Sequence, residues 1–99
     1  MSDKGRQLVA IVAGIAGVTF NSVISGCRRR PLPTCRWLVA QELIHIGYSS
    51  CRAASDLRLS HCTVLYGCQM LDRITEDNGY YDTDELFIKR EFQRLKNDL

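Results

Sequence analysis

The sequence lacks the segments that several large classes of protein require. No glycine-rich, phosphate-binding loop is present, and 99 residues leave no room for a nucleotide-binding fold beside a small core. The longest apolar run, Leu8 to Phe20, has thirteen residues, two of them glycines, and is too short to span a bilayer. Gly26-Cys27 and three arginines follow, an unsuitable sequence for a signal-peptide cleavage site. We therefore expect one small cytoplasmic protein without a membrane partner.

Metal-binding spacings are also missing. The sequence has five cysteines but no C-x-x-C pair, and the odd number argues against a fully paired disulfide scaffold. His45 and His61 supply no ligand at a zinc-site spacing, and His45 is expected to be partly buried. We expect no metal, no other cofactor, and cysteines that are small, buried and reduced. These cysteines are Cys27, Cys35, Cys51, Cys62 and Cys68.

The net charge is small, at +2, but the charged residues are unevenly distributed. Residues 1–70 carry eight basic and three acidic side chains, whereas residues 71–99 carry five basic and eight acidic ones. Three of the basic residues, Arg28, Arg29 and Arg30, are adjacent. A solvated surface explains any single arginine, but it is a weaker explanation for the triplet. A basic body with an acidic tail is typical of a protein that binds nucleic acid and turns the tail away.

Apolar residues recur at helical spacing along most of the chain, which predicts an all-α fold with six helices. The expected helices are 5–16, 20–25, 35–46, a short one from Ser50, 61–76 and 84–97, with Asp77-Asn78-Gly79 as a turn and Asp82 or Thr83 as the last cap. Pro31 and Pro33 predict a basic loop before the third helix. We divide the chain into a helix-turn-helix DNA-binding domain, 5–76, and an acidic turn with a C-terminal helix, 77–99.

The last predicted helix has an apolar stripe whose function is open. Ile88, Phe92, Leu95 and Leu99 repeat at helical spacing and are large for a terminal helix. The stripe predicts one of two arrangements. Either it forms a homodimer through the C-terminal helix, or it packs back onto the first helix.

The segment from Ile46 to Val64 is the most informative part of the sequence. It predicts a short helix capped by Ser50 with a buried side of Ala53, Ala54 and Leu57, followed by a turn at Arg58-Leu59-Ser60. Ser60 is placed to cap a second helix that begins with His61, Cys62 and Thr63. Tyr66 lies on the outer face of that helix, with Cys62, Gln69 and Arg73. A DNA-reading helix needs small or hydrogen-bonding side chains at its start.

Three stretches together resemble the C-terminal DNA-binding domain of the bacterial replication initiator DnaA, which has a Trp-repressor-like fold. LVAIVAGIAGVTFNSVISGCRR, from Leu8 to Arg29, is similar to that domain's first two helices and basic loop. Ala40 to Leu43, AQEL, is similar to the family's A-R-E-L. Gly47 to Val64 aligns without a gap with the signature G-Y-S-x-x-x-I-G-x-x-L-G-R-D-H-[ST]-T-V.

Four of the chain's departures from that signature lie at neighbouring positions, in the turn and at the start of the helix that follows it. Arg58 replaces its last glycine, Leu59-Ser60 replaces Arg-Asp, and Cys62 replaces the hydroxyl residue after His61. The segment between the basic loop and Ala40 is about one helical turn shorter than the corresponding segment of the family. The resemblance implies that His61, Thr63 and the arginines at 28–30 contact DNA, in a stand-alone domain without the initiator's ATPase part.

Two functions from different classes remain open at this point. The first is a stand-alone, sequence-specific double-stranded DNA-binding protein of the replication or transcription-regulator type, using the residues Arg28, Arg29, Arg30, Ser60, His61, Cys62, Thr63 and Tyr66. The second is a protein-interaction or dimerisation module that has lost DNA binding. We expect no enzyme, because neither paired carboxylates nor a nucleophile turn is evident. His61 and Cys62 do not form a thiol–histidine pair, since adjacent side chains on a helix point about 100° apart and cannot share a proton directly.

Overall fold

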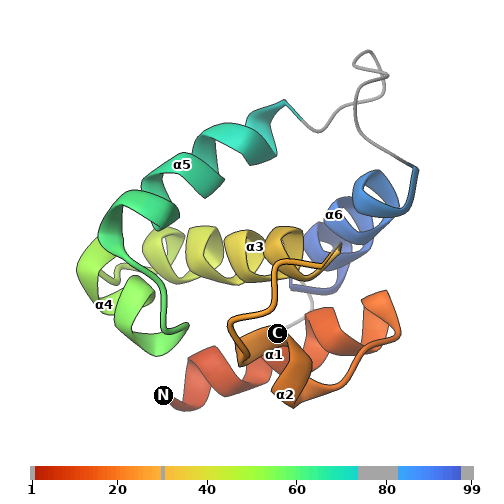
Figure 1. The fold of residues 1–99 in the computed structure, drawn as a ribbon, viewed down its shortest axis with the longest axis horizontal. Helices are drawn as coiled ribbons and strands as arrows, with labels where there is room; N and C mark the ends of the chain where they lie inside the picture. The colour runs from red at the N-terminus through yellow and green to blue at the C-terminus, as the bar shows by residue number, and fades with distance from the viewer. Residues whose placement is uncertain (1, 30, 74–82, 97–99) are drawn as a thin grey trace.

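A computed structural model describes residues 2–29, 31–73 and 83–96, and within these ranges the chain is all-helical (Figure 1). The helices are α1 (Asp3–Ala16), α2 (Phe20–Ile24), α3 (Leu32–His45), α4 (Ser50–Asp56), α5 (His61–Asp72) and α6 (Thr83–Lys96). The prediction of an all-α fold with six helices is confirmed for this part of the chain. Arg30, the turn at 77–79, Asp82 and Leu99 lie outside the described residues.

The N-terminal helices begin and end at residues that satisfy free backbone groups. Ser2 caps α1 by accepting a hydrogen bond from the Gly5 amide, so the helix begins two residues earlier than predicted. Gly17 ends it in the left-handed conformation at φ 71°, as expected for a helix C-terminus. Thr19 caps α2 by accepting from the Ser22 amide. The local sequence therefore determines where α1 begins and ends and where α2 begins.

The prediction that Pro31 and Pro33 both lie in a loop is wrong for Pro33. Pro31 is the residue before α3, and Pro33 lies in the first turn of that helix. The first amides of a helix have no intrahelical acceptor, so a proline there removes no hydrogen bond. Its fixed φ also suits the helix. Two prolines near a helix start therefore define where α3 begins instead of excluding a helix.

Helix α3 forms the centre of the fold and packs against each of the other five helices (Figure 1). Its apolar residues Leu38, Val39 and Leu43 are buried, but so are Arg36 and Glu42. A helix covered on most sides needs partners for its polar groups. Arg36 donates to backbone carbonyls, and Glu42 accepts from Lys96 Nζ at 2.7 Å. The core is thus organised around one helix with two satisfied buried charges.

The apolar stripe of α6 packs onto the same molecule. Ile88 and Phe92 are 3 % and 1 % exposed and belong to the core formed with α1 and α3. Two lysines of α6 hold its orientation, since Lys89 donates to the Leu71 carbonyl at 2.8 Å and Lys96 pairs with Glu42. Of the two predicted arrangements, the one in which the stripe covers the first helix is confirmed. Helix α6 therefore contributes to the same core as the helices before it.

The expectation that all cysteines are buried is wrong for three of them. Cys35 is buried and Cys68 half-buried, whereas Cys27, Cys51 and Cys62 are exposed. These three lie in the α2–α3 loop and on the outer sides of α4 and α5, where nothing covers their positions. His45, expected to be partly buried, is exposed in the last turn of α3. None of the helices in the described ranges is long and apolar enough to cross a membrane.

Candidate nucleic-acid interface

The α4–α5 hairpin forms the first part of the candidate interface. Ser49, not the predicted Ser50, caps α4 by accepting from the Arg52 amide at 3.1 Å. The buried side of α4 is as predicted, with Ala53, Ala54 and Leu57 in the core. The Leu59 amide donates to the Ala54 carbonyl at 2.8 Å, which closes a tight turn. The two helices are thus fixed by both their packing and their backbone hydrogen bonds.

The start of α5 is held by side-chain hydrogen bonds. Ser60 accepts from the Thr63 amide at 3.1 Å, as predicted, and its hydroxyl lies 2.7 Å from the Thr63 hydroxyl. Ser50 Oγ lies 2.6 Å from His61 Nε2 and links the first turns of the two helices. An N-cap of this kind stabilises a helix by about 1 kcal/mol. These contacts fix the first turn of α5 before any ligand is present.

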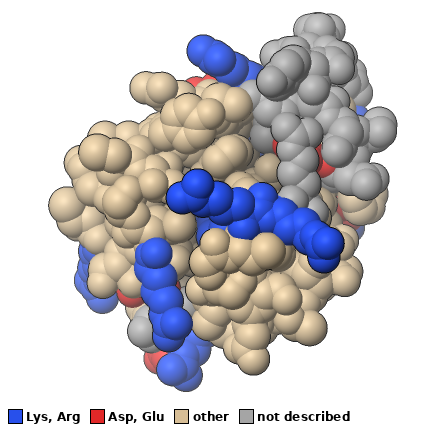
Figure 2. All heavy atoms as spheres, viewed as in Figure 1, with Lys and Arg blue, Asp and Glu red and all other residues tan. Residues whose placement is uncertain are grey.

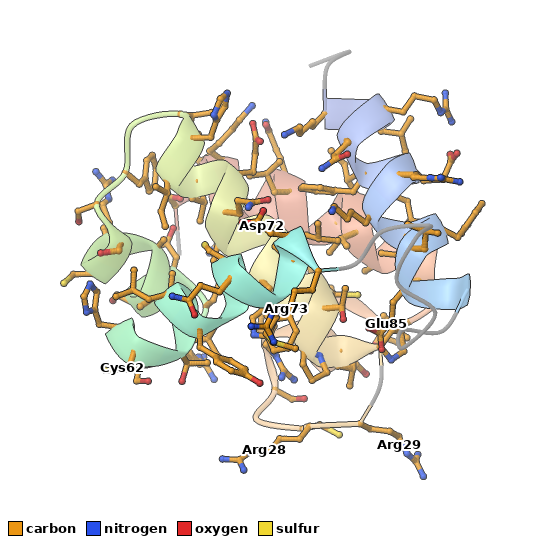
Figure 3. All side chains as sticks on the ribbon, turned by 90° about the horizontal axis from the view of Figure 1, so that it is seen from above. Arg28, Arg29, Cys62, Asp72, Arg73 and Glu85 are labelled. Carbon is orange, nitrogen blue, oxygen red and sulfur yellow. The ribbon has the colours of Figure 1, made fainter. Side chains whose placement is uncertain are left out.

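The α2–α3 loop forms the second part of the interface and carries the arginine cluster. Arg28 and Arg29 are exposed, and Figure 3 shows both extending away from the body on the side where Cys62 of α5 also lies. Arg36, which is 4 % exposed, donates from Nε to the Val23 carbonyl at 2.6 Å and from Nη2 to the Cys27 carbonyl. Burial lowers the pKa of its guanidinium. Arg36 therefore ties the loop to the central helix.

A hollow of about 700 Å³ separates the loop from α5, and we call it the loop–helix groove. One wall comes from the α2–α3 loop, the other from the α4–α5 turn and α5, and the floor from α3. Its lining residues are Ile24, Ser25, Gly26, Arg28, Pro33, Arg36, Trp37, Arg58, Leu59, Ser60, Thr63 and Tyr66. The groove thus joins residues that are separated by about thirty positions in the sequence.

The groove is cationic and partly aromatic. Three arginines and no carboxylate line it, and the positive end of the α5 dipole lies at Ser60. On the face in Figure 2, Lys and Arg side chains cross the middle and the carboxylates show at the margins. The rings of Trp37 and Tyr66 meet edge to face with centroids 6.0 Å apart. Such a surface attracts anions and offers aromatic faces beside them.

The groove brings together four of the eight residues predicted from sequence. Arg28, Ser60, Thr63 and Tyr66 line it. Arg29, His61 and Cys62 are exposed but lie outside its lining, and Arg30 lies outside the described residues. Tyr66 is 55 % exposed, and Gln69 and Arg73 are exposed further along α5, as predicted for its outer face.

Eight of the twelve lining residues were not predicted as site residues from the sequence, and three of these supply charge or an aromatic ring. Trp37 and Arg36 lie on α3, and Arg58 lies in the turn before α5. Trp37 stands beside Arg36 near the start of α3, and the only tryptophan of a small chain is a usable signal. The placement of Arg36 and Arg58 depends on how helices distant in sequence pack, so no local pattern could reveal it.

The groove shows no arrangement suited to a metal. Within the described ranges, no group of three or more histidine, cysteine or carboxylate side chains lies close enough to hold an ion. The arrangement is instead suited to a negatively charged ligand, which the arginines and the start of α5 can bind together. No protein family, curated protein or solved structure matches the chain, so a functional assignment depends on this geometry and on the residues that create it.

Proposed function

We propose that the protein binds double-stranded DNA, with α5 in the major groove and the α2–α3 loop on the adjacent backbone and minor groove. One observation carries this proposal. The loop–helix groove places Arg28 opposite Ser60, Thr63 and Tyr66, so a cationic loop and the polar start of a helix share one surface. A duplex presents a phosphate strand between its two grooves, and an interface with a helix on one side of that strand and a loop on the other fits it.

In this proposal the α2–α3 loop supplies affinity and the start of α5 supplies specificity. Exposed arginines release counterions when they contact phosphates, which gives affinity for any duplex. His61 and Thr63 lie in the first turn of α5, where side chains of a recognition helix reach base edges. The resemblance to the DnaA DNA-binding domain supports the same assignment, and it supports a regulator of replication or transcription. A homodimer through α6 does not belong to the proposal, because Ile88 and Phe92 are buried within one chain.

The first experiment tests the loop. Binding to a fluorescein-labelled random duplex is measured by anisotropy between 50 and 300 mM salt, for the wild type and for Arg28→Ala/Arg29→Ala/Arg30→Ala. We expect the variant to bind more weakly and its log–log salt slope to fall by up to about three. A matched control, Lys4→Ala/Arg6→Ala/Arg94→Ala, removes the same charge from α1 and α6 and should keep most of the slope. Equal slopes for wild type and loop variant would contradict the phosphate role.

The second experiment tests α5. A preferred duplex is selected from a random pool, and His61→Ala and Thr63→Ala are compared on that duplex and on random DNA. Each substitution should cost about 1–3 kcal/mol on the selected duplex and much less on random DNA. Equal losses on both would show that these residues only position the helix. Absence of binding to any duplex at low salt would instead favour the protein-interaction alternative.

A further inference from the structure

Arg58 has a backbone conformation that its side chain does not favour. Its φ is 58°, and it is the only residue other than glycine with a positive φ in the described part of the chain. The left-handed region brings Cβ close to the backbone, so glycine adopts it at no cost and arginine does not. The turn requires this conformation, because the amides of Arg58 and Leu59 donate back to α4. An arginine at such a position is typical of a functional constraint.

The side chain of Arg58 lies at the site already described. It is exposed and lines the loop–helix groove on the wall opposite Arg28. Among the residues that the structure describes, no hydrogen bond or ion pair engages its guanidinium. The nearby Asp56 carboxylate, which shares a second, smaller hollow with Arg58, accepts instead from the amide and hydroxyl of Ser2 at 3.3 and 2.6 Å. Arg58 is therefore available to a ligand.

The two exposed arginines of the groove, Arg28 and Arg58, suit one kind of group. Guanidinium groups donate planar pairs of hydrogen bonds that match the two free oxygens of a phosphodiester. Apolar atoms of Leu59 and Trp37 line the same groove and can pack against the sugar beside that phosphate. Base edges are assigned in the proposed function to His61 and Thr63 in the first turn of α5, which leaves the two arginines for the backbone.

We propose that Arg58 and Arg28 bind one phosphodiester of the DNA backbone across the loop–helix groove, and that this contact sets the register of α5. The inference depends on the proposed function and adds a DNA-binding residue to it. It also accounts for an arginine at a left-handed position. The side chain serves the interface while its backbone conformation destabilises the free protein.

This relation gives Arg58→Gly two effects of opposite sign. Glycine relieves the left-handed strain, so the melting temperature should equal or exceed that of the wild type, by up to roughly 4–8 °C. Loss of one phosphate contact should lower the salt slope by about one and the affinity at 150 mM salt about fivefold. Arg58→Lys keeps the charge and should keep the slope. Arg94→Ala, an exposed α6 arginine paired with Glu91, is the control with unchanged binding.

The outcomes separate the inference from the proposed function. If the wild type binds no duplex, the proposed function fails, and this inference fails with it. If the wild type binds and Arg58→Gly has the wild-type slope, the proposed function stands and the phosphate contact is wrong. A melting temperature clearly below that of the wild type would overturn the strain argument. Weaker binding with equal or higher stability supports the inference, because a general loss of structure cannot produce that combination.

Discussion

Gly67 allows α5 to approach the central helix, and its replacement offers a precise test of that packing. A Cβ at this position would lie 2.2 Å from Trp37 Cδ1 and 2.5 Å from Cγ. Carbon atoms in contact are separated by about 3.5–4.0 Å, so the ring or the helix must retreat by roughly 1.3–1.8 Å. The ring contacts Tyr66 edge to face and also lines the loop–helix groove, so its displacement would disturb both. Gly67→Ala should therefore strain the α3–α5 contact.

Two terms of opposite sign decide the stability of Gly67→Ala. Alanine favours a helix over glycine by about 1 kcal/mol, whereas overpacking costs about 1–3 kcal/mol. Gly14 supplies the matched control, because it is an exposed helical glycine whose added Cβ would contact nothing within 4 Å. Gly14→Ala should raise the free energy of unfolding by about 0.5–1 kcal/mol. The difference between the two variants then measures the steric cost alone.

Urea denaturation followed by far-ultraviolet circular dichroism measures both variants. A double-mutant cycle identifies the cause, because in a Trp37→Ala background the Gly67→Ala change should become as favourable as Gly14→Ala. Trp37 is the only tryptophan, so its emission also reports the displaced ring directly. The reasoning is refuted if Gly67→Ala stabilises the wild-type background as much as Gly14→Ala does.

Three further predictions concern the core and the cysteines. Phe92→Ala should lower the free energy of unfolding by about 3–5 kcal/mol. The denaturation midpoint should not depend on protein concentration, because the ring packs within one chain. A concentration-dependent midpoint would indicate an interface between copies. Iodoacetamide at pH 8 should modify exposed Cys27, Cys51 and Cys62 but modify Cys35 only after unfolding, as mass spectrometry of peptides can show. Burial raises the pKa of Cys35 to about 11, so the folded state retains its proton and stability should fall as the pH rises from 9.0 towards 11.

The sequence predicts local structure well where one helix end or turn determines it. Gly17, Ser60 and the buried residues of α4 lie where capping rules and helical periodicity place them. These features depend on neighbours within four residues, so a local pattern contains the information. Pro33 shows the limit of a local rule, since a helix-breaking residue is well tolerated in the first turn of α3.

Features that depend on distant contacts were not predictable in the same way. The burial of Arg36 and Glu42 follows from partners at residues 23, 27 and 96. The exposure of Cys27, Cys51 and Cys62 follows from the absence of a covering element. Residue type alone favours the opposite in each case, because arginine is rarely buried and cysteine usually is. The candidate site follows the same division. Its helix α5 was identified from a local pattern, whereas its floor on α3, which depends on distant contacts, was missed.

The floor connects the core to the proposed interface through two adjacent residues. Successive side chains on a helix point about 100° apart, so Arg36 and Trp37 reach the two opposite walls of the groove. Arg36 holds the α2–α3 loop through the carbonyls of Val23 and Cys27, while Trp37 packs where Gly67 and Tyr66 leave room on α5. The distance between the α2–α3 loop and α5 is therefore set by the buried helix α3. For the proposed function, this arrangement would hold the backbone contact and the proposed recognition helix at a fixed spacing, which is what a sequence-specific binder needs.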